Sequence, residues 1–131
     1  MILATPSFAT AQGQLQVTVR NFNVGGGSLM IGLFNNEHDF LKKAIRGKTV
    51  KLTADIVTVV FEDLEPGDYA VSVIHDRNNN GKLDTNRLGI PREGFAFGNN
   101  AMGMFGPPTF VKAKVSIRDN AVKQILNIKN F

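Results

Sequence analysis

Apolar and polar residues alternate along most of this chain. Leu15, Val17 and Val19 alternate with polar neighbours, and the same period of two recurs in later segments that carry many β-branched residues. The segments with this pattern are 15–20, 29–34, 48–53, 57–61, 69–75, 110–117 and 121–128. Such a period, with β-branched residues on one face, is typical of half-buried strands. Because two half-apolar sheets must cover each other, the pattern predicts an all-β fold, an antiparallel seven-stranded β-sandwich.

Short breaks between these segments predict the turns. Residues 25–28, which begin with three glycines, and the pair Asp119 and Asn120 each separate two strand segments, and we expect a hairpin at both places. Residues 37–45 carry apolar side chains at helical spacing, and Asn36 precedes them as a capping residue. We therefore expect one short helix after the second strand, where the chain crosses from one sheet to the other.

The segment between Asp76 and Pro108 shows neither a strand period nor a helix period. It is a long loop rich in Asn, Gly and Pro, and it far exceeds the roughly 15 residues above which loops in compact domains are uncommon. Such loops are usually either functional or disordered, and the phenylalanines and methionines of this one make it too apolar for disorder. We expect contacts or a ligand to hold it in place.

The long loop begins with a calcium-binding pattern. Residues 76–84 match the first nine positions of the loop D-x-[DN]-x-[DN]-G-x-x-x, with Gly81 at the sharp turn. Calcium takes about six to eight oxygen ligands, and this spacing aims every second residue at one point. The expected ligands are the side chains of Asp76, Asn78, Asn80 and Asp84 and the backbone carbonyl oxygen of Lys82.

The calcium pattern is incomplete at its twelfth position. Arg87 stands where such a loop normally has a bidentate glutamate, so the missing ligand must come from Asp84, Asn86 or Glu93. Few carboxylates and several neighbouring cations predict weak affinity, on the order of 10⁻⁴ to 10⁻³ M. The alternative is an Asx-rich turn that satisfies its own backbone without a metal.

Residues 94–110 contain a second candidate site. Phe95, Phe97 and Phe105 are the candidates to line a groove for a small ligand, a peptide or a glycan. Alternatively, these rings pack beneath the loop as a satellite core. The two alternatives differ in exposure, because a binding site leaves the rings open to a cavity whereas a core buries them.

Motifs of catalysis are missing from the sequence. His38 and His75 are its two histidines, and it contains no nucleophile elbow, zinc-protease motif or phosphate-binding loop. His75 adjoins Asp76, but neighbours on a strand point to opposite faces and make a poor acid–base pair. We therefore expect a non-enzymatic protein in which His75 closes a strand or supports the loop.

Composition and charge narrow the class of protein further. A length of 131 residues, with 43% hydrophobic and 20% charged residues, fits one ordinary globular domain. The net charge of +4 comes from cations that are scattered over alternating segments, which argues against nucleic-acid binding. The chain has no cysteine for a disulfide or a thiolate metal site, and no apolar run reaches membrane-spanning length.

The amino-terminal residues suggest export. Residues 1–11 are uncharged, rich in small side chains and end in an A-x-A pattern, which resembles the end of a secretory signal peptide. We expect a signal-peptide remnant over 1–11, a single β-sandwich domain over 12–131, and a periplasmic, secreted or cell-surface location. The partner would then be an envelope or extracellular protein or a glycan. The alternative is an ordinary floppy terminus.

Two stretches carry resemblances to known proteins. Pro66 and Gly67 suit a tight turn, and Tyr69 begins the next strand, which resembles transthyretin-like and immunoglobulin-like sandwiches. The combined run of 75–86, 89–100 and 106–110 resembles bacterial secreted proteins grouped as the domain of unknown function 2141. This likeness covers nearly all of the chain from position 15 onward. It implies a small exported β-sandwich and implies no particular function.

Overall fold

The computed structural model of the protein describes residues 13–20, 27–76, 94–103 and 106–129. Its strands are β1 (Gly13–Arg20), β2 (Ser28–Phe34), β3 (Arg46–Lys51), β4 (Ile56–Leu64), β5 (Gly67–Asp76), β6 (Phe95–Phe97), β7 (Val115–Ile117) and β8 (Ala121–Asn127). A 3₁₀ turn, η2 (Gly98–Asn100), and a single helical turn, α1 (Phe110–Ala113), lie between β6 and β7. The predicted all-β class is confirmed.

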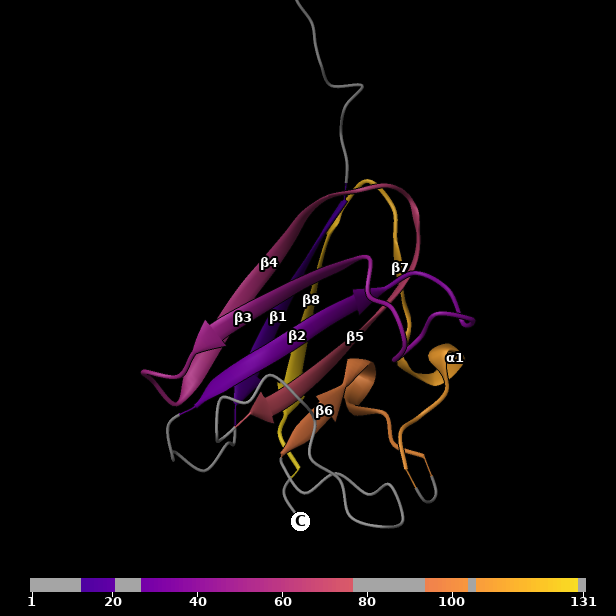
Figure 1. The fold of residues 1–131 in the computed structure, drawn as a ribbon. Helices are drawn as coiled ribbons and strands as arrows, with labels where there is room; N and C mark the ends of the chain where they lie inside the picture. The colour runs from indigo at the N-terminus through magenta and orange to yellow at the C-terminus, as the bar shows by residue number, and fades with distance from the viewer. Residues whose placement is uncertain (1–12, 21–26, 77–93, 104–105, 130–131) are drawn as a thin grey trace, which may run out of the picture.

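The strands form two sheets with one apolar core (Figure 1). One sheet has the order β4-β1-β8, and the other has the order β3-β2-β5-β6, with β7 also paired to β5. Alternation decides which residues face inward: Leu15, Val17 and Val19 of β1 are buried, and the polar residues between them are not. Inward residues of both sheets join in a single cluster, so burial of this shared apolar surface holds the sheets together.

The sheet around β1 is mixed. β4 pairs with β1 in the antiparallel sense, but β8 runs parallel to β1, with Gln14 opposite Ala121 and Arg20 opposite Asn127. The predicted wholly antiparallel arrangement is therefore wrong for this pair. The path of the chain explains it: β7 belongs to the other sheet, so the chain changes sheets and enters β8 beside the start of β1. There the Gln14 N–H donates to the carbonyl oxygen of Asn120 at 3.0 Å.

Both hairpin predictions are wrong. β1 and β2, which flank residues 25–28, belong to different sheets. The same holds for β7 and β8, which flank Asp119 and Asn120. An alternating pattern tells which face of a strand is buried, and it does not tell which strand lies alongside. In both places the chain uses the short break to cross between sheets.

The predicted helix over 37–45 is also wrong, because residues 37–42 form turns. Asn36 does act as a cap, since its Oδ1 accepts a hydrogen bond from the Asp39 N–H at 2.9 Å. The segment nevertheless cannot continue as a helix, because Leu41 has a left-handed φ of 64°.

The helical turn lies instead in the segment 110–117, which the sequence pattern assigns to one strand. Thr109 caps α1, and its Oγ1 accepts a hydrogen bond from the Lys112 N–H at 3.4 Å. Only β7 is extended in this segment. β6 lies within the predicted long loop, where the sequence pattern indicates no strand. Its three residues are all buried, so they show no alternation that would reveal it.

A corner between the two sheets is fixed by Tyr69. Pro66 and Gly67 turn the chain from β4 into β5, and Tyr69 is only 6% exposed. Its hydroxyl donates to the backbone carbonyl oxygen of Glu65 at 2.6 Å. A tyrosine near the start of a strand whose hydroxyl bonds to the backbone a few residues upstream is called a tyrosine corner. Burial raises the pKa of Tyr69, Glu65 raises it further, and Arg46 lowers it.

A second apolar cluster covers the outer face of the β5 sheet. Phe34 and Phe40 meet edge to face with ring centroids 5.3 Å apart, and Phe40 and Phe110 do so at 5.8 Å. These rings come from β2, from the turns after it and from α1. β5 is therefore buried on both faces, which explains its continuous burial from Tyr69 to Val73.

Candidate functional site

The predicted calcium loop begins where β5 ends. Asp76 is the last residue of β5 and is 2% exposed. The other predicted ligands, Asn78, Asn80, Lys82, Asp84 and Glu93, lie outside the described residues, as does the alternative ligand Asn86. Within the described ranges, no group of three or more His, Asp or Glu side chains could hold a metal ion. Of the predicted set, only Asp76 thus has a known environment.

The two ends of the long loop are held side by side. The His75 N–H donates to the carbonyl oxygen of Gly94 at 2.8 Å. The ladder between β5 and β6 continues from this contact, with Ile74 opposite Phe95 and Ser72 opposite Phe97. The chain therefore leaves β5 at Asp76 and returns beside the same strand.

His75 is enclosed in the core. Its side chain is 0% exposed and lies on the same side of β5 as Val71 and Val73, whose side chains belong to the cluster between the sheets. Asp76 is the adjacent residue and points to the opposite side of the strand.

The aromatic residues of the second candidate site are buried where they are described. Phe95 is 2% exposed and Phe97 is 4% exposed, and their ring centroids lie 5.5 Å apart. Both rings belong to the apolar cluster that covers the outer face of β5. Phe105 lies outside the described residues. For Phe95 and Phe97 this burial corresponds to the satellite core and leaves almost no ring surface for a ligand.

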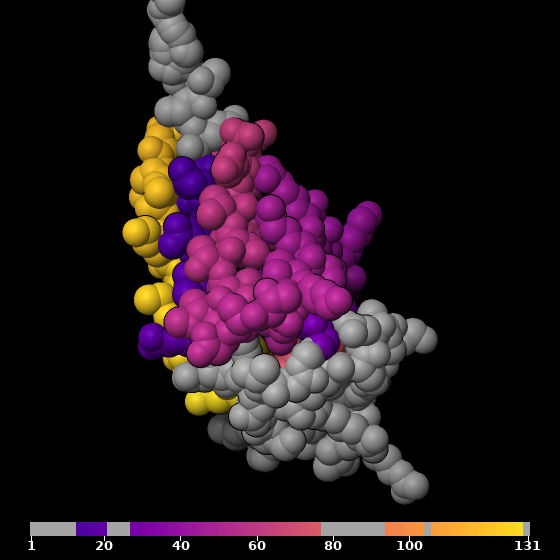
Figure 2. Space-filling view, turned by 90° about the vertical axis from the view of Figure 1, so that its left-hand side faces the viewer, coloured from indigo at the N-terminus to yellow at the C-terminus, as the bar shows by residue number. Residues whose placement is uncertain are grey.

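One surface hollow lies away from both predicted sites. A cavity of about 630 Å³ lies where β3 meets β4, the edge strands of the two sheets, and Arg46, Lys48, Phe61 and Glu62 are among its lining residues. Figure 2 shows the atoms of β3 and β4 side by side on this face. Neither Asp76 nor the buried phenylalanines line this cavity.

Arg46 and Lys48 bridge the seam between the sheets. Arg46 donates from Nη1 to the carbonyl oxygen of Glu62 at 2.5 Å and from Nη2 to that of Asp63 at 3.1 Å. The Lys48 ammonium lies 5.6 Å from the ring centroid of Phe61. Our sequence analysis missed these residues. The signal was present, because residues 42–51 hold five cations and no acidic residue.

Comparison with known proteins identifies a family for this chain. The sequence model of a family described as an uncharacterized protein conserved in bacteria, DUF2141, matches residues 17–125. Searches of curated proteins and of solved structures gave no match. Among the described residues, no helix is long and apolar enough to span a membrane.

Proposed function

Because this chain belongs to DUF2141, a bacterial family without an assigned role, we propose a function from its own residues. It is an exported, non-enzymatic β-sandwich module that binds calcium in the loop beginning at Asp76. The bound ion orders the start of the long loop for contact with an envelope or extracellular partner. The transthyretin-like or immunoglobulin-like form of the sandwich is part of this proposal, and the corner at Tyr69 supports it.

The observation that carries the calcium proposal is the position of Asp76. The first residue of the calcium pattern is a carboxylate with 2% exposure at the end of a central strand. Buried carboxylates require hydrogen bonds, ion pairs or a metal to offset their lost hydration. A calcium ion would add to whatever contacts hold this buried carboxylate.

The pinned ends of the loop support a specific replacement for the missing twelfth ligand. The β5–β6 ladder pairs Ile74 with Phe95, and the His75–Gly94 hydrogen bond keeps the same register. Glu93 immediately precedes Gly94 in the sequence, so it is the acidic candidate nearest to this paired end of the loop. We therefore favour Glu93 over Asp84 and Asn86 as the ligand that completes the site.

Thermal unfolding and calorimetry test the calcium proposal. We expect millimolar calcium to raise the melting temperature relative to a chelator, since binding to the folded state alone stabilises it by about 2.7 kcal/mol at a hundredfold excess over Kd. Magnesium should raise it less, because it prefers a tight octahedral shell and retains its waters.

Variants distinguish a loss of calcium binding from a general loss of stability. Asp84→Ala and Glu93→Gln should each reduce the calcium-dependent shift without lowering the melting temperature in chelator, and Asp76→Asn should reduce the shift and also lower basal stability. Asp55→Asn, an exposed carboxylate between β3 and β4, is the matched control and should keep the full shift. An unchanged melting temperature in calcium, with no heat of binding, would reduce the motif to an Asx-rich turn.

A further inference from the structure

Several edges of the two sheets are covered by local contacts. At β8, the Asn100 side chain donates from Nδ2 to the Ile125 carbonyl oxygen at 3.0 Å and accepts the Asn127 N–H on Oδ1 at 2.9 Å. At β6, Phe95 exchanges two backbone hydrogen bonds with Lys129, at 3.0 and 2.8 Å. Covered edges of this kind prevent strands of other molecules from pairing there.

The outer edge of β3 has no such cover among the described residues. β3 pairs with β2 alone, and it is the last strand of its sheet. The register shows which backbone groups point outward. The Leu52 N–H donates to the Gly27 carbonyl oxygen at 3.0 Å, so positions 46, 48 and 50 turn their backbone groups toward β2. Gly47, Thr49 and Lys51 therefore present theirs to the outer edge.

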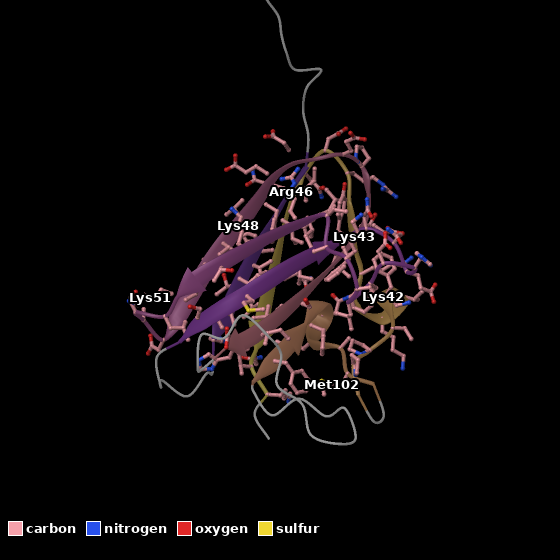
Figure 3. All side chains as sticks on the ribbon, viewed as in Figure 1. Lys42, Lys43, Arg46, Lys48, Lys51 and Met102 are labelled. Atoms are coloured by element: carbon pink, nitrogen blue, oxygen red, sulfur yellow. The ribbon has the colours of Figure 1, made fainter. Side chains whose placement is uncertain are left out.

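A stripe of cations follows this open edge. We call it the basic edge; it consists of Lys42, Lys43, Arg46, Lys48 and Lys51. All five side chains belong to exposed residues, and Figure 3 shows them spread along β3 and the turns before it. No described carboxylate lies within 4.0 Å of any of them, since the ion pair found among the described residues joins Lys114 to Asp68. Two N–H groups of Arg46 already bond to backbone carbonyls of β4, but no described carboxylate neutralises the charge of the basic edge, so that charge is available to an external partner.

From these two features we propose that the basic edge binds an extended acidic peptide segment of a partner protein, which adds to β3 as a further strand. The outward backbone groups of Gly47, Thr49 and Lys51 would supply the ladder, as in other cases of strand addition. Arg46 and Lys48 would meet acidic side chains on one face of the new strand, and Lys51 would meet them on the other. This inference does not depend on calcium binding.

An extended peptide fits the arrangement of the cations better than a partner with a broad, flat surface. The cations follow one strand and the turns that lead into it, rather than spreading over a face (Figure 3). Edge lysines also serve simply to keep strands of other molecules away. That role and the proposed one make opposite predictions, because a protective edge rejects an acidic strand as it rejects any other.

The test uses a fluorescent eight-residue peptide that repeats two threonines and two glutamates, so that an extended peptide carries glutamates on both faces, with anisotropy measured at low and at physiological salt. We expect saturable binding that weakens as salt rises, since exposed charges are screened over about 8 Å at 0.15 M. The same peptide with lysine in place of glutamate should not bind. Lys48→Gln combined with Lys51→Gln should weaken binding at least about fivefold, whereas Lys112→Gln on α1 should leave it unchanged.

One further variant and one modified peptide distinguish an added strand from charge attraction alone. Thr49→Pro removes one outward N–H, keeps every cation, and lies at an edge position where proline is tolerated. N-methylation of alternate amides in the peptide removes the same ladder from the other side, so the test stands even if Thr49→Pro fails to fold. Both changes should abolish binding. Three results would each overturn the proposal. They are unchanged affinity for the N-methylated peptide, binding of sulfated dextran as tight as that of the acidic peptide, and no binding of the acidic peptide.

Discussion

The tyrosine corner offers a sharp test of how the two sheets are joined. Replacing Tyr69 by phenylalanine removes one hydroxyl and keeps the ring in the core. The lost hydrogen bond to Glu65 is short, at 2.6 Å, and lies in a partly buried site. A typical intramolecular hydrogen bond contributes about 0.5–1.5 kcal/mol, so Tyr69→Phe should lower the free energy of unfolding by about 1 kcal/mol. For a chain of this length, that is a fall of roughly 3–5 °C in melting temperature.

The pH dependence gives the same prediction a second, independent readout. Burial is the main cause of the raised pKa of Tyr69, so the folded state favours the neutral phenol. A pKa raised on folding means that the folded state retains the proton longer than the unfolded chain does. Its contribution to stability is therefore complete below the unfolded pKa of about 10 and is lost as pH rises through the higher folded value.

The assay is favourable because the protein has one tyrosine and no tryptophan. Phenolate absorbance therefore reports Tyr69 alone, and urea unfolding of wild type and Tyr69→Phe gives the stability difference at each pH. We expect a constant difference from pH 7 to 9 and a shrinking one above about pH 10. A phenol that titrates at or below its ordinary pKa, or a Tyr69→Phe variant as stable as wild type at pH 7, would refute the argument.

Two more substitutions probe the contacts that hold the edges and the outer face. Asn100→Ala should lower the free energy of unfolding by about 1–3 kcal/mol, because it removes two hydrogen bonds to the edge of β8. Hydrogen exchange of the Asn127 amide should also accelerate. Unchanged exchange of this amide would show that Asn100 does not cover the edge of β8. Phe40→Ala should cost about 3–5 kcal/mol by urea unfolding, since it empties the centre of the outer cluster, and Leu41→Ala, whose side chain is 38% exposed, should cost far less. Equal losses for the two variants would show that the turns do not pack as described.

The strands were predictable wherever one face is buried and the other is wet. β1 is the clearest case, since its burial alternates along its whole length as its sequence does. β6 was not predictable, because Phe95, Ala96 and Phe97 are buried on both faces and leave no period. Pairing was not predictable either. Nothing in the alternation of β8 tells that it lies parallel to β1.

The failed helix shows how an apolar spacing can mislead. Phe40, Leu41 and Ile45 suggest one helical face, yet Phe40 is 8% exposed while Leu41 and Ile45 are 38% and 45% exposed. A single ring is enough to anchor the segment to the outer cluster, and the others are free to remain in water. For the candidate calcium site, Asp76 is the one ligand whose environment is described, so the remainder of that prediction rests on sequence spacing.

The two proposed sites can be tested separately because of where they lie on the same sheet. Lys51 of β3 and Asp76 of β5 are both paired with Ser28 of β2, so two strand spacings separate their backbones. Two such spacings amount to about 10 Å, slightly more than the screening length at physiological salt. Calcium at Asp76 therefore changes the potential at Lys51 only weakly, and it is farther still from Arg46 at the other end of β3. At physiological salt, chelation should leave the affinity of the acidic peptide nearly unchanged, so a failure of either proposal would not be mistaken for a failure of the other.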